Sequence, residues 1–173
     1  LFRSRLAHQF FPKNGLNRAV ILGDVGKQMA LQRILLEQRD DLPYFCHMMD
    51  KNGFVSRLGK TITEFFRYRV TPEQLETLST QEGLSHSVQD KCRDMASIYR
   101  RYEEFLSQTY LTGDTTLSLL EEKLASSAAF GDTEIWLDGF YGFTPQEYGV
   151  IAQLLRLCKR VSITLPMDEH SYF

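Results

Sequence analysis

The feature that most constrains the fold is a strand–loop–helix–strand pattern between residues 133 and 165. The short apolar run Ile135–Leu137 ends at one carboxylate, Asp138, which predicts a strand covered on both faces. Residues 161–165 predict a second strand, and the segment between the two predicts a helix. A helix that connects two neighbouring strands makes them parallel, so the pattern predicts a parallel sheet and an α/β fold.

The start of the connecting helix is marked by a capping pattern. Thr144 is a suitable N-cap, Pro145 a suitable first helical residue, and Glu147 completes a capping box. The residues expected on its buried face are Tyr148, Ile151, Ala152, Leu155 and Cys158.

The remainder of the chain predicts helices. They are expected over residues 3–11, 24–39, 53–69, 71 to about 80, and 87–108. In the second of these helices Asp24 is expected to be the cap, with Met29, Leu31, Ile34 and Leu35 buried. The last of the five has a near-heptad seam, typical of an antiparallel bundle, formed by Val88, Cys92, Met95, Tyr99, Tyr102 and Leu106. Residues 44–49 are expected to form a loop packed onto the core, and residues 20–22 are ambiguous. Residues 112–114 predict a turn, followed by a helix that buries Leu117, Leu120 and Leu124.

Charge is distributed unevenly along the chain, although the net charge is only −2. Residues 1–69 hold 12 Lys/Arg and 6 Asp/Glu, a net of +6, and residues 70–173 hold 8 and 16, a net of −8. The basic half could face a polyanion or form an ordinary solvated surface. No signal peptide or long apolar span is recognisable, and the three cysteines lack metal or disulfide spacing, so we expect a cytoplasmic protein without a membrane segment.

Asp138 is the strongest candidate for a functional residue. In P-loop NTPases an Asp at the end of a strand helps to hold Mg²⁺, and helicases of that class usually place a Glu next to it. Here Gly139 follows, and no GxxxxGK[ST] motif occurs in the sequence. We therefore expect a degenerate Walker B carboxylate, no catalytic residue and no ATP hydrolysis. The alternative is a strand-end Asp that accepts hydrogen bonds from loop amides.

Three aromatic residues, Phe140, Tyr141 and Phe143, follow Asp138 in a loop with glycines. Aromatic rings on loops stack on unpaired nucleic-acid bases, which makes them candidate DNA contacts. Alternatively they pack beneath the next helix, and Phe143 in particular could meet Tyr148 as a hydrophobic staple.

The block W-L-D-G-F-x-G-F-T-P-Q-E-Y at residues 136–148 resembles the AddB subunit of bacterial AddAB helicase–nucleases, which are relatives of RecBCD. The resemblance extends over residues 5–7, 23–27 and 66–73, and so covers essentially the whole chain. It implies part of a RecA-like, P-loop superfamily 1 helicase core that carries a helical insertion bundle. Residues 1–22 and 131–173 would belong to the core, and residues 23–130 to the insertion.

The resemblance also implies a function: a fragment of one subunit of an ATP-dependent helicase/exonuclease acting in double-strand break repair and recombination. Its DNA contacts would include Arg3, Arg5 and His8, and the segment would hold or scan single-stranded DNA for Chi. The partners implied are single-stranded or duplex-end DNA and an AddA-like motor subunit. The full-length protein would use Mg²⁺, ATP and a 4Fe–4S cluster, whose ligands lie outside this chain. Two alternatives stay open: a structural nucleotide-binding scaffold, and a helical module that docks AddA through the seam from Val88 to Leu106.

Overall fold

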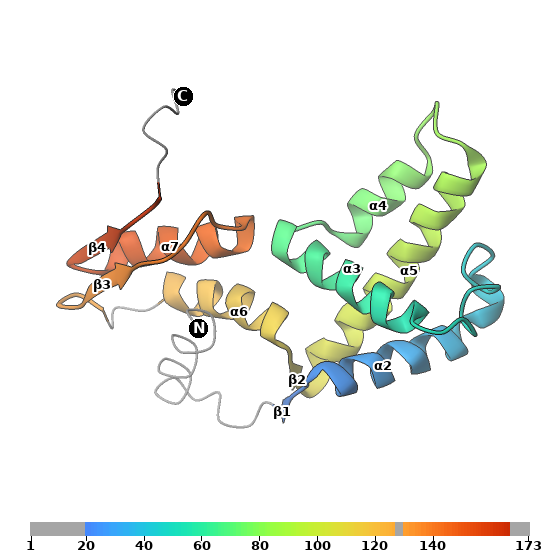
Figure 1. The fold of residues 1–173 in the computed structure, drawn as a ribbon, viewed down its shortest axis with the longest axis horizontal. Helices are drawn as coiled ribbons and strands as arrows, with labels where there is room; N and C mark the ends of the chain where they lie inside the picture. Colours follow the sequence, from blue (N-terminus) through green and yellow to red (C-terminus); the bar gives the residue numbers. More distant parts are fainter. Residues whose placement is uncertain (1–19, 127–129, 167–173) are drawn as a thin grey trace. The chain divides into compact units, whose positions relative to one another are not determined.

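The computed structural model describes residues 20–126 and 130–166. They belong to two compact units, Leu1–Thr115 and Thr116–Phe173, and the division falls in the first turn of helix α6 (Gly113–Ala125). Within the described residues each unit contains one two-stranded parallel sheet (Figure 1). The helix predicted over residues 3–11, with Arg3, Arg5 and His8, lies outside the described residues.

Unit 1 is mainly helical. Its elements are β1 (Val20–Ile21), α2 (Asp24–Glu37), the short 3₁₀ helix η2 (Arg39–Asp41), α3 (Phe54–Tyr68), α4 (Pro72–Ser79), α5 (His86–Thr109) and β2 (Tyr110–Leu111). The two strands pair in parallel, with Val20 opposite Tyr110. The sequence left residues 20–22 ambiguous and gave no indication of β2.

Helix α5 forms the centre of unit 1, since both α2 and α4 pack against it. Met95, Tyr99, Tyr102 and Leu106 are buried in one hydrophobic core, which confirms the predicted seam over most of its length. Val88, near the start of the helix, is exposed, so the buried part of the seam does not include it. Because these side chains fill the core of their own unit, they are not available to dock a partner.

Two predictions for α2 are wrong. Gly23, rather than Asp24, is the N-cap, and Asp24 lies in the first turn within 4.0 Å of Lys27. Met29 is 69% exposed, while Leu31 and Leu35 are buried as predicted. The helix carries apolar residues on two opposite faces, and the core takes only one of them.

A buried carboxylate holds the predicted loop over residues 44–49 on the core. Asp94 of α5 is 1% exposed, and its Oδ2 accepts hydrogen bonds from the backbone N–H groups of Tyr44 at 2.9 Å and Phe45 at 3.0 Å. Phe45 and Met49 are buried, as expected for a packed loop. Burial raises the pKa of Asp94 above its ordinary range, against the lowering effect of the two amides.

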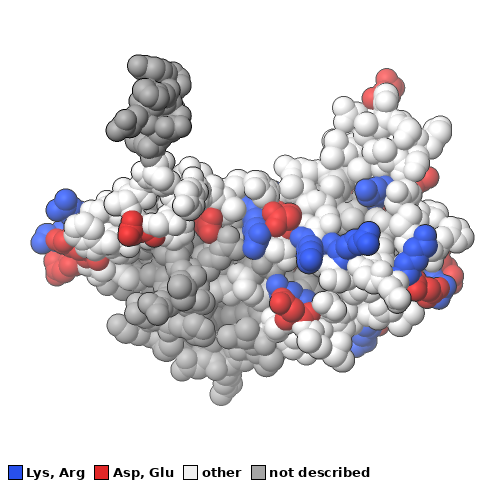
Figure 2. Space-filling view, viewed as in Figure 1, with Lys and Arg blue, Asp and Glu red and all other residues white. Residues whose placement is uncertain are grey.

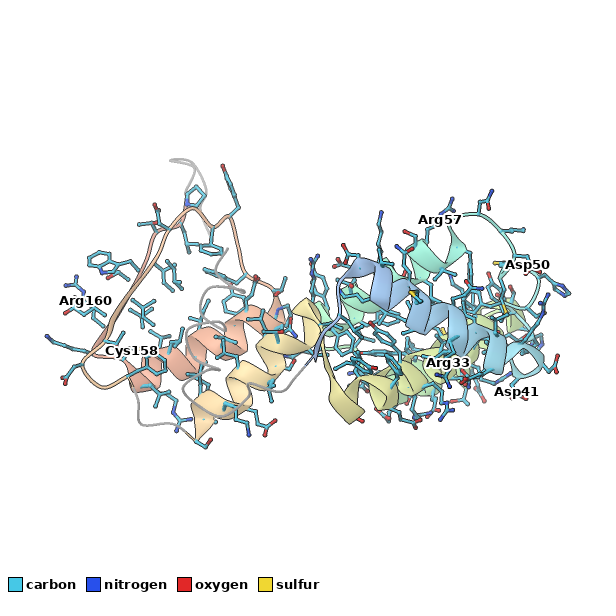
Figure 3. The ribbon with its side chains drawn as sticks, turned by 90° about the horizontal axis from the view of Figure 1, so that it is seen from below. Arg33, Asp41, Asp50, Arg57, Cys158 and Arg160 are labelled. Carbon is cyan, nitrogen blue, oxygen red and sulfur yellow. The ribbon has the colours of Figure 1, made fainter. Side chains whose placement is uncertain are left out.

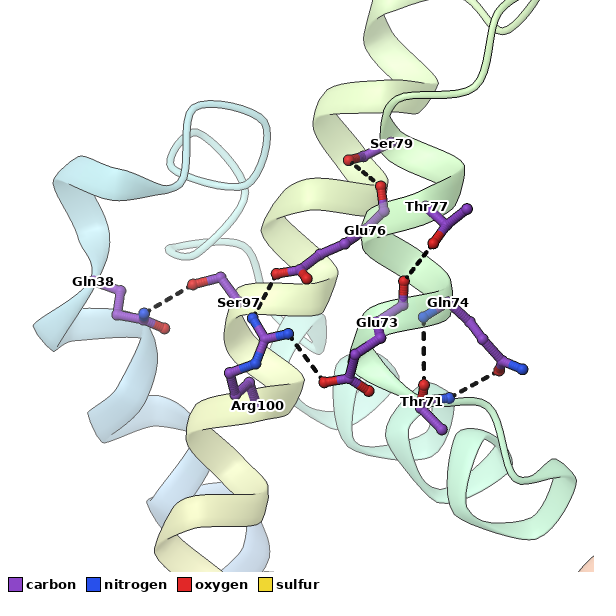
Figure 4. A network of polar contacts seen from close by, with 9 residues as sticks. All are labelled: Gln38, Thr71, Glu73, Gln74, Glu76, Thr77, Ser79, Ser97 and Arg100. Carbon is purple, nitrogen blue, oxygen red and sulfur yellow. Dashed lines mark hydrogen bonds and ion pairs between the residues drawn. The ribbon is translucent and has the colours of Figure 1, made fainter.

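Polar contacts connect α2 and α4 to α5 (Figure 4). The Arg100 guanidinium donates to Glu76 at 2.5 Å and to Glu73 at 3.2 Å, and Gln38, the C-cap of α2, donates to Ser97 at 3.0 Å. At the start of α4, the side chain of Thr71 accepts from the Gln74 backbone and the Gln74 side chain accepts from the Thr71 backbone, as a capping box requires.

Unit 2 contains the predicted strand–helix–strand pattern. Its remaining elements are β3 (Glu134–Leu137), α7 (Pro145–Leu157) and β4 (Arg160–Ile163). The strands pair in parallel from Glu134 opposite Arg160 to Leu137 opposite Ile163, which confirms the prediction. The protein is thus a mostly helical α/β fold. Two strands do not amount to a RecA-like core, so that assignment and the three-part domain division stay predictions.

Helices α6 and α7 lie alongside each other in unit 2 (Figures 1 and 3). Leu117, Leu120 and Leu124 of α6 are fully buried, as predicted, and the buried Gln146 of α7 donates from Nε2 to Ser118 Oγ at 3.0 Å. The predicted turn at 112–114 is wrong after its first residue, because α6 begins at Gly113.

The buried faces of α7 and β3 differ from the predictions. Ile151 is buried as predicted, and Val150 and Leu154 are buried beside it. Tyr148 is 58% and Leu155 57% exposed, and Ala152 is also exposed, so these three predictions are wrong. The helix face centred on Val150 and Leu154 packs into the core, rather than the face centred on Tyr148 and Leu155. Strand β3 is not covered on both faces, since Trp136 is 68% exposed.

Among the described residues, no helix combines the length and apolarity needed to cross a membrane.

Candidate functional site

The candidate site lies at the carboxyl edge of the β3–β4 sheet, where both strands end. Asp138 follows β3 directly and Thr164 follows β4 directly. The Thr164 N–H donates to the Leu137 carbonyl at 2.9 Å, which extends the pairing by one residue. The Thr164 hydroxyl donates a hydrogen bond to Asp138 Oδ1. The position of Asp138 is the one the pattern indicated, while its role as a magnesium-side carboxylate stays a prediction.

A cavity of ≈ 380 Å³ opens at this edge. Its lining residues are Asp138, Gly139, Tyr141, Thr164, Leu165 and Pro166. Gly139 has a φ of 78°, a left-handed conformation that glycine adopts without a steric penalty, and it turns the chain sharply after Asp138. Tyr141, two residues later, is 93% exposed, so its ring stands in solvent beside the cavity.

The three loop aromatics do not share one environment. The Phe140 and Phe143 ring centroids are 5.0 Å apart, and Phe143 meets the Tyr148 ring edge-on at 5.7 Å. Phe143 therefore packs at the first turn of α7 as the staple alternative proposed. Of the three, Tyr141 has the most accessible face for a ligand.

A capping box fixes the end of the loop. Glu147 Oε2 accepts from the Thr144 backbone N–H at 2.8 Å and from the Thr144 hydroxyl at 2.9 Å, while the Thr144 side chain accepts from the Glu147 N–H. Glu147 is buried, so this end of the loop is held firmly. The loop is thus anchored at Asp138 by Thr164 and at Thr144 by Glu147, with Tyr141 between the two anchors.

The outward face of the sheet carries an exposed cation–π pair. The Arg160 guanidinium lies 5.6 Å from the centre of the Trp136 ring, and Figure 3 shows Arg160 on the side of the sheet away from α7. Trp136 is the single tryptophan of the chain and lies two residues before Asp138, so its fluorescence reports on this edge.

The described residues at the edge do not by themselves make a magnesium–nucleotide site. Mg²⁺ in nucleotide sites is held by one or two carboxylates together with water and the phosphates of the substrate. Among the described residues that line the cavity, Asp138 is the one carboxylate, and its Oδ1 already accepts the Thr164 hydroxyl. Within the described ranges, no group of three or more His, Cys, Asp or Glu side chains could hold a metal ion.

Sequence reasoning missed Thr164, Leu165 and Pro166. The available signal was the position of Thr164 directly after the second predicted strand, at the same edge as Asp138 if the strands are parallel. Arg3, Arg5 and His8 lie outside the described residues, so their predicted DNA contacts stay predictions.

Comparison with known proteins gives one family over nearly the full sequence. The family described as ADDB, N-terminal matches residues 2–173. The chain belongs to this family. Proteins similar to this chain include ones named as the B subunit of an ATP-dependent helicase/deoxyribonuclease, from Lachnoclostridium phytofermentans, Acetivibrio thermocellus and Desulforamulus reducens. The resemblance seen in the sequence is thereby confirmed.

The three relatives are 34%, 38% and 36% identical to the chain over 165, 165 and 180 residues. The matches cover 95%, 95% and 98% of this chain, but only 14%, 14% and 16% of those proteins. The chain thus spans about one seventh of the length of the curated relatives it matches.

Proposed function

We propose that the chain is the N-terminal part of the B subunit of an ATP-dependent helicase/deoxyribonuclease, and that it holds single-stranded DNA without hydrolysing ATP. The printed names of its relatives support the first half of the proposal. In this proposal the full complex processes DNA ends in double-strand break repair, and an AddA-like protein supplies the motor. The β3–β4 sheet would be the described part of a RecA-like core completed by other segments.

Two features of the sequence support the absence of hydrolysis. Gly139 stands where helicases of the P-loop class place the glutamate that polarises water, and the sequence contains no GxxxxGK[ST] motif. The hydrogen bond from Thr164 gives Asp138 a structural role, because it joins the ends of the two strands. We call the hydrogen bond between Asp138 and Thr164 the clasp, because it joins the two strands at the carboxyl edge of the sheet.

The observation that carries DNA binding is the 93% exposure of Tyr141 in a loop anchored at both ends. An exposed ring on a fixed loop loses little entropy when an unpaired base stacks on it. Stacking of this kind contributes about 1–3 kcal/mol per base and tolerates any sequence. Scanning for Chi would require further contacts, for which Arg5 and His8 remain the candidates.

The test is fluorescence anisotropy of labelled oligo(dT), and of an abasic strand of equal length, with the 173-residue chain. Tyr141→Ala should weaken oligo(dT) binding by about 5–150-fold, the range that 1–3 kcal/mol corresponds to. Tyr141→Phe, which keeps the ring, is the matched control and should bind as the wild type does. The abasic strand should not distinguish the variants. Equal oligo(dT) affinity of Tyr141→Ala and wild type would refute the stacking role.

Hydrolysis is tested separately by phosphate release from ATP in the presence of Mg²⁺ and oligo(dT). No release above the protein-free blank is expected. Turnover that Asp138→Ala abolishes would overturn the proposal that Asp138 serves in the clasp alone.

A further inference from the structure

Unit 1 has a polar groove between α2 and α3, with a volume of ≈ 680 Å³. Its lining residues are Asp24, Lys27, Gln28, Ser56, Gly59, Lys60, Thr63, Glu64 and Arg67. Ser56, Gly59 and Thr63 follow each other at steps of three and four, so small side chains line one stripe of α3. Gly59 allows the helices to approach, because a Cβ there would lie 3.3 Å from Leu31 Cδ1.

Cations are concentrated along this side of α3. Lys60 and Arg67 line the groove from α3, and Lys27 lines it from α2. Arg57 lies one helical turn before Lys60 on α3 and is exposed. Figure 2 shows Lys and Arg side chains in a row across the face that α3 occupies, and Figure 3 shows Arg57 extending from α3 into solvent. Helix α3 itself holds Arg57, Lys60 and Arg67 against the single acid Glu64.

The acids of the groove are each beside one of its cations. Asp24 is 4.0 Å from Lys27, and Glu64 accepts a hydrogen bond from Arg67 at 2.8 Å. In the described part of the chain, neither the Arg57 guanidinium nor the Lys60 ammonium has an ion-pair partner, and both residues are exposed. These two neighbouring cations of α3 therefore carry positive charge that no described acid neutralises.

The donors in the groove match the chemistry of a phosphodiester backbone. Phosphate oxygens in protein–DNA complexes are bound by Arg and Lys and by the side chains of Ser, Thr and Gln. Here Ser56 and Thr63 supply hydroxyls, Gln28 supplies an amide, and Lys60 supplies charge. Arg57, one turn before Lys60 on α3, adds a second positive charge beside the groove. No aromatic ring is among the described residues that line the groove, so it offers contacts to phosphates and not to bases.

We infer that the α2–α3 groove is a second DNA site, which binds the phosphate backbone of a strand irrespective of its bases. This inference rests on the proposed function, since it assumes that DNA is the ligand of the chain. The groove differs from the Tyr141 loop in its chemistry: it should bind single strands, duplexes and abasic strands alike. Its contribution to affinity should fall steeply with salt, because phosphate contacts release counterions.

The experiment measures oligo(dT), duplex and abasic-strand binding by anisotropy over a salt series. The variant Arg57→Glu/Lys60→Glu should weaken all three probes and reduce the slope of log Kobs against log salt by about 2, or roughly one for each phosphate that is no longer bound. The matched control is Lys91→Glu/Arg93→Glu on α5, which makes the same change in net charge at two exposed residues. Thermal unfolding by circular dichroism checks that each variant is folded.

An equal loss of slope in the α5 control would overturn the inference, because net charge alone would then account for it. An unchanged slope in the groove variant would also overturn it. A variant that loses affinity for poly-L-glutamate but keeps its DNA affinity would assign the groove to an acidic protein segment instead. The two proposals fail separately: if Tyr141→Ala is silent and Arg57→Glu/Lys60→Glu lowers the slope, the stacking role is refuted and the groove stands.

Discussion

Replacement of Asp94 by alanine tests how unit 1 holds the loop over residues 44–49. The Asp94 carboxylate is 1% exposed and accepts two backbone N–H groups, from Tyr44 at 2.9 Å and Phe45 at 3.0 Å. Alanine leaves both amides without this acceptor. A buried donor without a partner costs about 1–3 kcal/mol, and removal of a desolvated carboxylate offsets part of the loss. We expect Asp94→Ala to lower the free energy of unfolding by about 2–3 kcal/mol.

Asp94→Asn is the matched control, because its side-chain oxygen can still accept from both amides. Burial raises the folded-state pKa of Asp94 above the ordinary 3.8, so the folded chain binds this proton more tightly than the unfolded chain. Protonation of Asp94 therefore stabilises the folded state. This stabilisation is complete below pH 3.8 and is lost as the pH rises through the folded-state pKa. The difference in stability between the wild type and Asp94→Asn should therefore change over this acidic window and stay constant above it.

Urea unfolding followed by circular dichroism measures both effects, and amide hydrogen exchange at Tyr44 and Phe45 locates them. Asp94→Ala should accelerate exchange at these two amides more than elsewhere in unit 1. Unfolding of Asp94→Ala at the wild-type urea concentration, or exchange of both amides at the wild-type rate, would refute the anchoring role of Asp94.

Three further predictions concern the caps and polar links. Thr144→Ala should destabilise unit 2 by about 1 kcal/mol, and Thr144→Ser much less, as measured by urea unfolding; equal losses would contradict the cap. The hydrogen bond from Arg100 lowers the pKa of Glu76, so stability from this pair is present above the ordinary 4.5 and is lost as pH falls through the lowered value. Arg100→Ala should raise the Glu76 pKa toward 4.5 in an NMR titration, and no movement would contradict the pairing. Thr164→Val removes the hydroxyl that Asp138 accepts, and should shift Trp136 fluorescence with no loss of helix content; an unchanged emission spectrum would count against the clasp.

Local rules predicted the helices well. The capping box at Thr144 was recognisable from two residues three positions apart, because a cap depends on a few neighbouring atoms. The α5 seam was predictable for a similar reason: Met95, Tyr99 and Leu106 recur at a spacing that only one helix face can satisfy.

Tertiary choices were not predictable from the same patterns. Helix α7 has apolar residues around much of its circumference, so periodicity could not decide between the face of Leu155 and the face of Leu154. The choice depends on α6, whose Ser118 pairs with Gln146, and nothing local in the sequence indicates that pairing. Trp136 is exposed because within the described residues only one face of its two-stranded sheet is covered by a helix, which a count of apolar residues cannot reveal.

Some residues of the candidate site could be predicted from the sequence, and others could not. Asp138 follows from the strand pattern and the glycine after it, and Tyr141 from its place in the loop. Thr164 was not found, because its link to Asp138 requires the register of β3 against β4 as well as their direction. The α2–α3 groove likewise depends on how two helices pack, although the cations of α3 were visible in the sequence.

The central claim is that this chain binds single-stranded DNA by stacking on the exposed Tyr141 ring and does not hydrolyse ATP. Paired titrations of oligo(dT) and abasic strand against wild type, Tyr141→Ala and Tyr141→Phe, without nucleotide, test it most directly. We predict a loss of affinity that is confined to oligo(dT) in Tyr141→Ala and restored in Tyr141→Phe. Binding that appears only when ATP is added, or a wild-type affinity in Tyr141→Ala, would contradict the claim.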